Sequence, residues 1–135
     1  MSYALSTKVH RSFTDALDAT RVSLSEQGFG VLTEIDLQAT LKARLDVDIP
    51  AQVILGACRP ALAYATLAAE PSAGLLLPCN VVVRYLDNET TMVEALDPLV
   101  MVSLTHNETL SQVADEAGLR LAAALDSLTP ALAES

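Results

Sequence analysis

The hydrophobic pattern of the chain changes repeatedly between the two-residue period of a strand and the period of about 3.6 residues of a helix. Alternating or continuous apolar runs predict strands at residues 3–9, 29–35, 52–57, 79–86 and 91–96. Helical spacing predicts helices at residues 13–27, 37–45, 60–70 and, for the longest, about 108–128. Residues 72–78 are expected to form an extended connection, and residues 97–104 fit a turn, a short strand or a loop before the last helix.

Polar residues and a proline mark the ends of the predicted helices. Ser12 stands where an N-cap side chain accepts a backbone N–H, with Asp15 three residues later, and Asp36 can cap the next helix in the same way. Gly28 stands where a helix ends in the left-handed conformation that glycine adopts without strain. Pro60 suits the first turn of the third helix, where a backbone N–H is not needed.

This order of elements is neither strictly alternating nor segregated into strands and helices. It predicts an α+β fold: a two-layer single domain over residues 1–135, with a mixed, mostly antiparallel sheet and helices packed largely on one face. The core is expected to span residues 3–128, followed by a flexible tail at residues 129–135. The run at residues 52–57 is apolar without alternation, which predicts a strand covered on both faces or lying inside the sheet.

Charge excludes several classes of partner. The 135 residues carry 8 Lys and Arg against 17 Asp and Glu, which gives a net charge of −9. No segment of the sequence concentrates Lys and Arg. A nucleic-acid partner is therefore not expected, because binding the phosphate backbone needs a concentrated basic surface. No stretch is long and apolar enough to suggest a membrane span or signal peptide, so a cytoplasmic protein with two free thiols is expected.

Familiar catalytic and metal-binding motifs do not occur. The chain has no phosphate-binding glycine loop and no pair of cysteines at C-x-x-C spacing. His10 and His106 are far from the cysteines in sequence, so a metal site made of two cysteines and two histidines is not expected, and the sequence does not identify a cofactor. Neighbouring carboxylates such as Asp46 and Asp48 are interpreted as solvated surface groups.

The two cysteines carry the strongest chemical signal. Cys58 ends an apolar strand two residues before Pro60 opens a helix, where the helix N-terminus, and Arg59 if it folds back, can lower the pKa of a thiol. Cys79 begins the next strand and precedes Asn80, whose amide can donate a hydrogen bond to a thiolate or a ligand. A parallel arrangement of these strands would place the thiols at opposite ends, and an antiparallel one at the same end. The sequence leaves both arrangements open.

The segments "VILGACRPALAYATLAAEPSAGLLLPCNVVVR", "GFGVLTEIDLQATLKARLDVDIP" and the later "LDP" before a terminal helix resemble domain-of-unknown-function family 302 of bacteria and archaea. The resemblance covers roughly residues 3–128, and its most distinctive blocks are residues 56–60 and 77–80. It implies a small two-layer α+β domain that is commonly dimeric, without an established activity. The positions it would assign to a shared site are Cys58, Cys79 and Asn80.

Three functional hypotheses follow. The first is a homodimeric binding or regulatory module that holds a small molecule or a metal near Cys58, Arg59, Cys79 and Asn80. The second is a thiol-redox or thiol-transfer enzyme with Cys58 as nucleophile and Cys79 as resolving thiol. The third is an interaction domain whose cysteines only pack in the core. The first is favoured because the chain shows no acid, base or cofactor motif.

Overall fold

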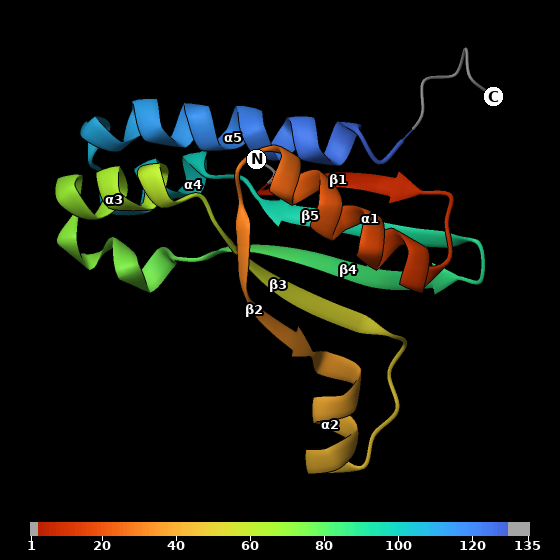
Figure 1. Ribbon diagram of the computed structural model, residues 1–135. Coiled ribbons are helices and arrows are strands. Elements are labelled where there is room, and N and C mark those ends of the chain that lie inside the picture. Colours follow the sequence, from red (N-terminus) through yellow and green to blue (C-terminus); the bar gives the residue numbers. More distant parts are fainter. Residues whose placement is uncertain (1–2, 130–135) are drawn as a thin grey trace.

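A computed structural model of the chain describes residues 3–129 and contains a five-stranded sheet with the order β1-β5-β4-β3-β2 (Figure 1). All four pairs of neighbouring strands are antiparallel, which confirms the predicted α+β class. The strands are β1 (Ala4–Val9), β2 (Gly30–Asp36), β3 (Gln52–Cys58), β4 (Cys79–Asp87) and β5 (Thr90–Leu96). The helices are α1 (Phe13–Glu26), α2 (Leu37–Leu45), α3 (Pro60–Ala69), α4 (Leu99–Thr105) and α5 (Ser111–Asp126), with 3-10 helices η1 (Pro71–Leu76) and η2 (Glu108–Leu110).

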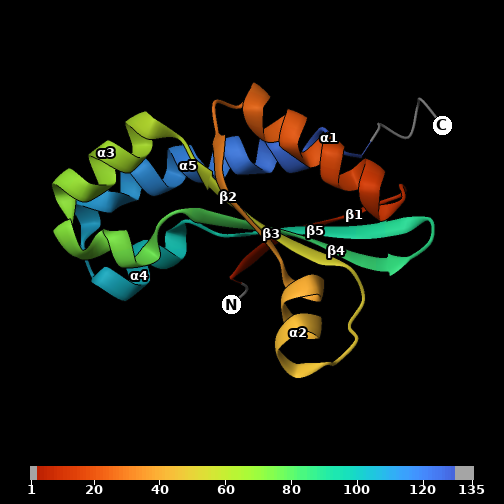
Figure 2. The same ribbon diagram turned by 60° about the horizontal axis from the view of Figure 1, so that its bottom comes forward.

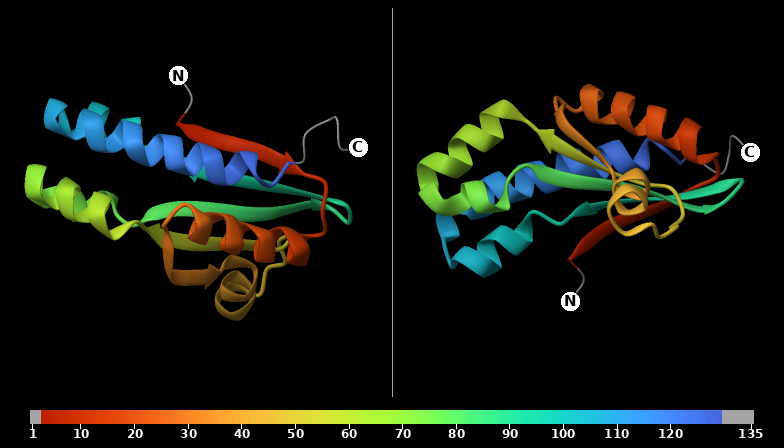
Figure 3. Two further views of the ribbon diagram at one scale, coloured as in Figure 1. Left: turned by 45° about the horizontal axis from the view of Figure 1, so that its top comes forward. Right: turned by 90° about the horizontal axis from the view of Figure 1, so that it is seen from below.

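The hydrophobic core lies between one face of the sheet and the helices α1 and α5 (Figure 1; Figure 3, left). Alternate residues of the strands point into it, as the two-residue period of a strand requires. From α5 it takes the stripe at helical spacing that includes Leu121 and Leu125. Strand residues of the core include Val9, Val53, Leu55, Ala57, Val81, Val83, Val93 and Ala95.

The predicted helix caps are confirmed. The Ser12 hydroxyl accepts the backbone N–H of Asp15 at 3.2 Å, and the Asp36 carboxylate accepts that of Ala39 at 2.9 Å. Gly28 has a φ of +83°, the left-handed conformation expected after α1. Polar side chains at these positions satisfy N–H groups that the first turn of a helix leaves without partners.

Two segments differ from the prediction. Residues 72–78 are not an extended connection, because η1 begins at Pro71, whose fixed φ suits the start of a helical turn. Residues 97–104 contain α4, which begins where the Asp97 carboxylate accepts the backbone N–H of Leu99 at 3.0 Å.

The apolar run at residues 52–57 forms strand β3, which lies inside the sheet between β2 and β4. Ile54, on the face of β3 away from the core, is only partly buried. Apart from Thr129, the predicted flexible tail lies outside the described residues.

Helix α2 is set apart from the other helices. It projects from the β2–β3 end of the sheet, away from α1 and α5 (Figures 1 and 2). None of its residues is buried, and Leu45 is 67% exposed. Strand β2 forms an edge of the sheet. Within residues 3–129, no helix combines the length and apolar character needed to cross a membrane.

Candidate functional site

Antiparallel pairing brings the two cysteines to the same end of the sheet. Cys58 is the last residue of β3, Cys79 is the first residue of β4, and Ala57 is the register partner of Cys79. Of the two arrangements that the sequence left open, the structure therefore has the one in which the thiols can act together. Both cysteines are free, and both are partly exposed.

Cys58 and Cys79 both line one small cavity, which we call the dithiol cavity. It lies where α3, α4 and α5 meet the ends of β3 and β4, and Figures 1 and 2 show how these elements are arranged. Its volume is about 20 Å³, which is room for about one water molecule. The remaining lining is almost entirely apolar: Phe29, Ala57, Arg59, Leu62, Ala63, Thr66, Leu77, Met101, Val113 and Ala117.

Arg59 is the one charged residue of this lining, and its guanidinium is held in place. Its Nε–H donates to the carbonyl oxygen of Gln27 at 3.0 Å, and Nη1 lies 4.0 Å from Oε1 of Glu116. Gly28 makes room for this arrangement, because a Cβ there would lie 2.9 Å from Nε of Arg59. The guanidinium thus bridges the end of α1 and helix α5 beside the cavity.

The environment of Cys79 favours the neutral thiol. Burial raises the pKa of Cys79 above its ordinary value, and the neighbouring Cys58 raises it further. Cys79 is therefore a poor free nucleophile at neutral pH, but it can lose its proton to a ligand that replaces the proton.

Asn80 lies on the opposite face of the sheet from Cys79. Its register partner is Gly56, on the face away from α1 and α5, whereas Cys79 pairs with Ala57 on the core face. Asn80 lines a separate, open hollow of about 330 Å³ together with Tyr3 and Glu94. The structure thus brings Cys58, Arg59 and Cys79 together and places Asn80 elsewhere.

Met101 is a lining residue that the sequence analysis did not select. It lies on α4, and its side chain is 4% exposed. The segment had no clear secondary-structure signal, so nothing in the sequence directed its thioether towards the cysteines. His10 and His106 are exposed and do not line the cavity. Among residues 3–129, no three His, Cys, Asp or Glu side chains are grouped to hold a metal ion.

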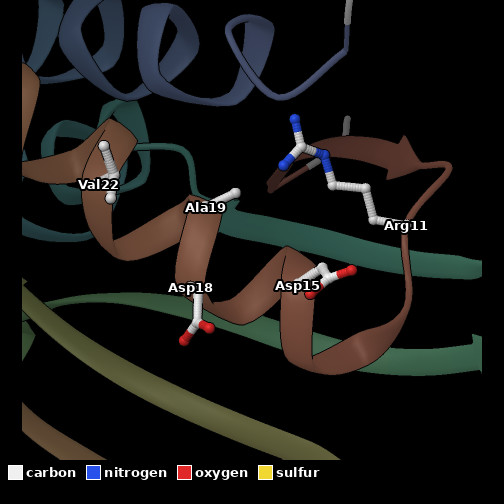
Figure 4. A pocket seen from close by; sticks show the side chains of 5 residues that line it. All are labelled: Arg11, Asp15, Asp18, Ala19 and Val22. Atoms are coloured by element: carbon white, nitrogen blue, oxygen red, sulfur yellow. The ribbon is translucent and has the colours of Figure 1, made fainter.

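A larger hollow, of about 510 Å³, lies along the outer side of α1 (Figure 4). Arg11, Asp15 and Asp18 line it with Ala19 and Val22. The two carboxylates are exposed, and Asp18 points away from Arg11 in Figure 4. Such solvated charges do not create the apolar surroundings that change acid–base behaviour, so we do not assign a site there.

Comparisons with known proteins identify the family. Residues 5–128 match the family described as Domain of unknown function DUF302. The chain is similar to the crystal structure of an uncharacterized conserved DUF302 protein from Bacillus stearothermophilus, at 28% identity and a TM-score of 0.86. That similarity covers 93% of this chain and 98% of the other. A comparison with curated proteins found no match. With the family match spanning nearly its whole length, the chain belongs to the DUF302 family.

Proposed function

We propose that this protein is a binding module that holds an ion in the dithiol cavity, with Cys58 and Cys79 as its ligands. The observation that carries the proposal is that both free cysteines line the same small, largely apolar cavity. Two thiols in one small space form a chelating pair, whereas an isolated core cysteine only fills volume. The function follows from this pairing.

The size of the cavity selects the kind of ligand. Pockets that bind organic molecules usually have volumes of about 300–1,000 Å³. The dithiol cavity has about 20 Å³, which suits a single atom or ion. A metal ion or a metalloid therefore fits better than the small molecule that the sequence analysis also considered.

Arsenite is a direct probe of the thiol pair. One As(OH)₃ reacts with two thiols to form two As–S bonds and release two water molecules. We expect reduced protein to take up one arsenic atom per chain and to become protected from iodoacetamide at both Cys58 and Cys79. Peptide mass mapping reads the two cysteines separately.

The controls are Cys58→Ala and Cys79→Ala. Each keeps one thiol and should lose the stable adduct, while the remaining cysteine should react with iodoacetamide whether or not arsenite is present. If arsenite protects neither cysteine of the wild-type protein, the two thiols do not act as a pair and the proposed function fails.

A thiol-redox activity is the second candidate, and the same shared cavity favours it. In that mechanism Cys58 attacks a substrate disulfide, forms a mixed disulfide and expels one substrate thiol; Cys79 then displaces the second thiol and leaves a protein disulfide. Its test is alkylation of Cys58 across pH 5–9. Rapid reaction with a midpoint well below the usual thiol value of about 8.5 would favour this activity over ion binding.

We also propose that the module is a homodimer that buries the surface formed by β2 and α2. A nine-residue helix is marginally stable in water unless packing supports it, yet no residue of α2 is buried in the single chain. The unpaired edge of β2 carries Leu32 and Ile35, which are 67% and 46% exposed. A second copy can cover both features at once through a two-fold contact.

Sedimentation velocity tests the dimer with two matched variants. Ile35→Glu places a charge on the β2 surface and should produce a monomer. Val22→Glu makes the same kind of change on the outer side of α1, where the side chain is 60% exposed, and should leave the dimer intact. A monomeric wild-type protein at micromolar concentration would contradict the proposal.

A further inference from the structure

We propose that the dithiol cavity is a copper(I) site in which the thiolates of Cys58 and Cys79 bind the metal and the thioether of Met101 is a third, weaker ligand. The inference rests on the proposed function and names the ion. It is argued from three sulfur-containing residues of three different elements, β3, β4 and α4, that line one cavity.

The donor set decides between metals. Soft thiolate and thioether ligands favour copper(I), which is stable with two or three ligands. Structural zinc takes four nitrogen, sulfur or oxygen ligands, and iron–sulfur clusters are held by four cysteines or by cysteines with histidine. The cavity lining contains two cysteines and a methionine, without histidine or carboxylate. It therefore fits a metal of low coordination number and high affinity for sulfur.

Charge in the cavity is also accounted for. Two thiols and one Cu⁺ form a complex with a net charge of −1 and release two protons, and no electron is transferred. An anion in apolar surroundings is unstable without a counter-charge. Arg59 lines the same cavity and is held there by its hydrogen bond to the Gln27 carbonyl oxygen, so its guanidinium supplies the positive charge.

The test is an anaerobic titration of the reduced full-length protein with Cu(I), in competition with a chromogenic Cu(I) chelator. We expect one copper per chain in the wild-type protein and loss of binding in Cys58→Ala and Cys79→Ala. Met101→Leu should weaken binding by about 10–100-fold, in the range seen when a supporting metal contact is removed. Met92→Leu is the matched control, because Met92 lies on β5 and does not line the cavity.

X-ray absorption spectroscopy at the copper edge counts the sulfur ligands of the bound metal. It does not depend on the cysteine variants, which could fail to fold. Three sulfur neighbours in the wild-type protein and two in Met101→Leu support the site as proposed. Equal counts in the two proteins exclude Met101 as a ligand and overturn the proposed donor set. Arsenite protection without copper binding overturns the choice of copper and leaves the proposed function standing. If arsenite does not protect the cysteines and copper does not bind, both the copper site and the proposed function are wrong.

Discussion

Gly56 occupies a position in β3 with no room for a side chain. A Cβ atom there would overlap Oγ1 of Thr33 and lie 2.8 Å from Cγ of Pro78. Thr33 is exposed and can rotate, but the proline ring is rigid and precedes Cys79. We therefore predict that Gly56→Ala destabilises the protein and moves Cys79 relative to the dithiol cavity.

Two opposing effects set the magnitude. Replacing glycine by alanine inside a strand stabilises a protein by about 0.5–1 kcal/mol, because glycine loses more backbone entropy on folding. Overpacking costs about 1–3 kcal/mol. The overpacking is larger here because the contact with Pro78 is shorter than the roughly 3.4 Å of ordinary carbon contact. The free energy of unfolding should fall by about 1–2 kcal/mol in Gly56→Ala.

Gly30 provides the matched control for this prediction. It also lies in the sheet, but a Cβ there would lie no closer than 3.8 Å to another residue, the Cys58 carbonyl oxygen. Gly30→Ala should therefore keep the entropic gain without the overpacking. Urea unfolding followed by circular dichroism measures both variants, and the two midpoints should differ by roughly 1 M in urea.

The site should respond together with the stability. In Gly56→Ala, arsenite should protect Cys58 and Cys79 less completely than in the wild-type protein, whereas Gly30→Ala should leave protection unchanged. If Gly56→Ala proves as stable as Gly30→Ala, the close packing of Pro78 on β3 does not position Cys79 and this reasoning is wrong.

Three further changes test the surroundings of the cysteines and the caps. Cys79→Ser should destabilise the protein more than Cys79→Ala by about 1–3 kcal/mol in urea unfolding, because the hydroxyl enters an apolar cavity; equal losses would mean that water reaches it. The raised pKa of Cys79 means that the unfolded chain loses this proton first, so stability should fall as pH rises from about 9 towards the folded pKa. The slope should be at most about 1.4 kcal/mol per pH unit and should be absent in Cys79→Ala. Asp36→Ala removes the cap of α2 and should cost about 0.5–2 kcal/mol, while Asp36→Asn, which keeps an accepting oxygen, should restore most of it.

Local signals in the sequence were sufficient for most of the fold. The periodicity of residues 13–27 and the caps at Ser12 and Asp36 depend only on neighbouring residues, and the structure has both helices. The segment containing Met101 lacked a helical period: the Asp97 carboxylate does accept the backbone N–H of Leu99, but α4 also depends on burial against α5. The sequence therefore did not identify Met101 as a candidate ligand.

Asn80 illustrates a constraint that the sequence did contain. Once residues 79–86 are a strand, successive side chains point to opposite faces, so Cys79 and Asn80 cannot face the same cavity. Ala57 and Cys58 nevertheless both line the dithiol cavity, at the end of β3 where the chain turns towards Pro60.

Chain length explains why the thiols meet. Helix α3 has 10 residues and carries the chain about 15 Å away from the end of β3 at 1.5 Å per residue. The six residues of η1, at about 2.0 Å each, bring it back about 12 Å. Figure 1 shows this outward and returning path beside the end of the sheet. Because the two lengths nearly cancel, β4 starts where β3 ended, and antiparallel pairing places Cys79 next to Cys58. An extended segment of six residues would span about 20 Å and would carry the chain about 5 Å past the end of β3. The 3-10 conformation of η1 therefore keeps the outward and returning lengths nearly equal and helps to bring Cys79 beside Cys58.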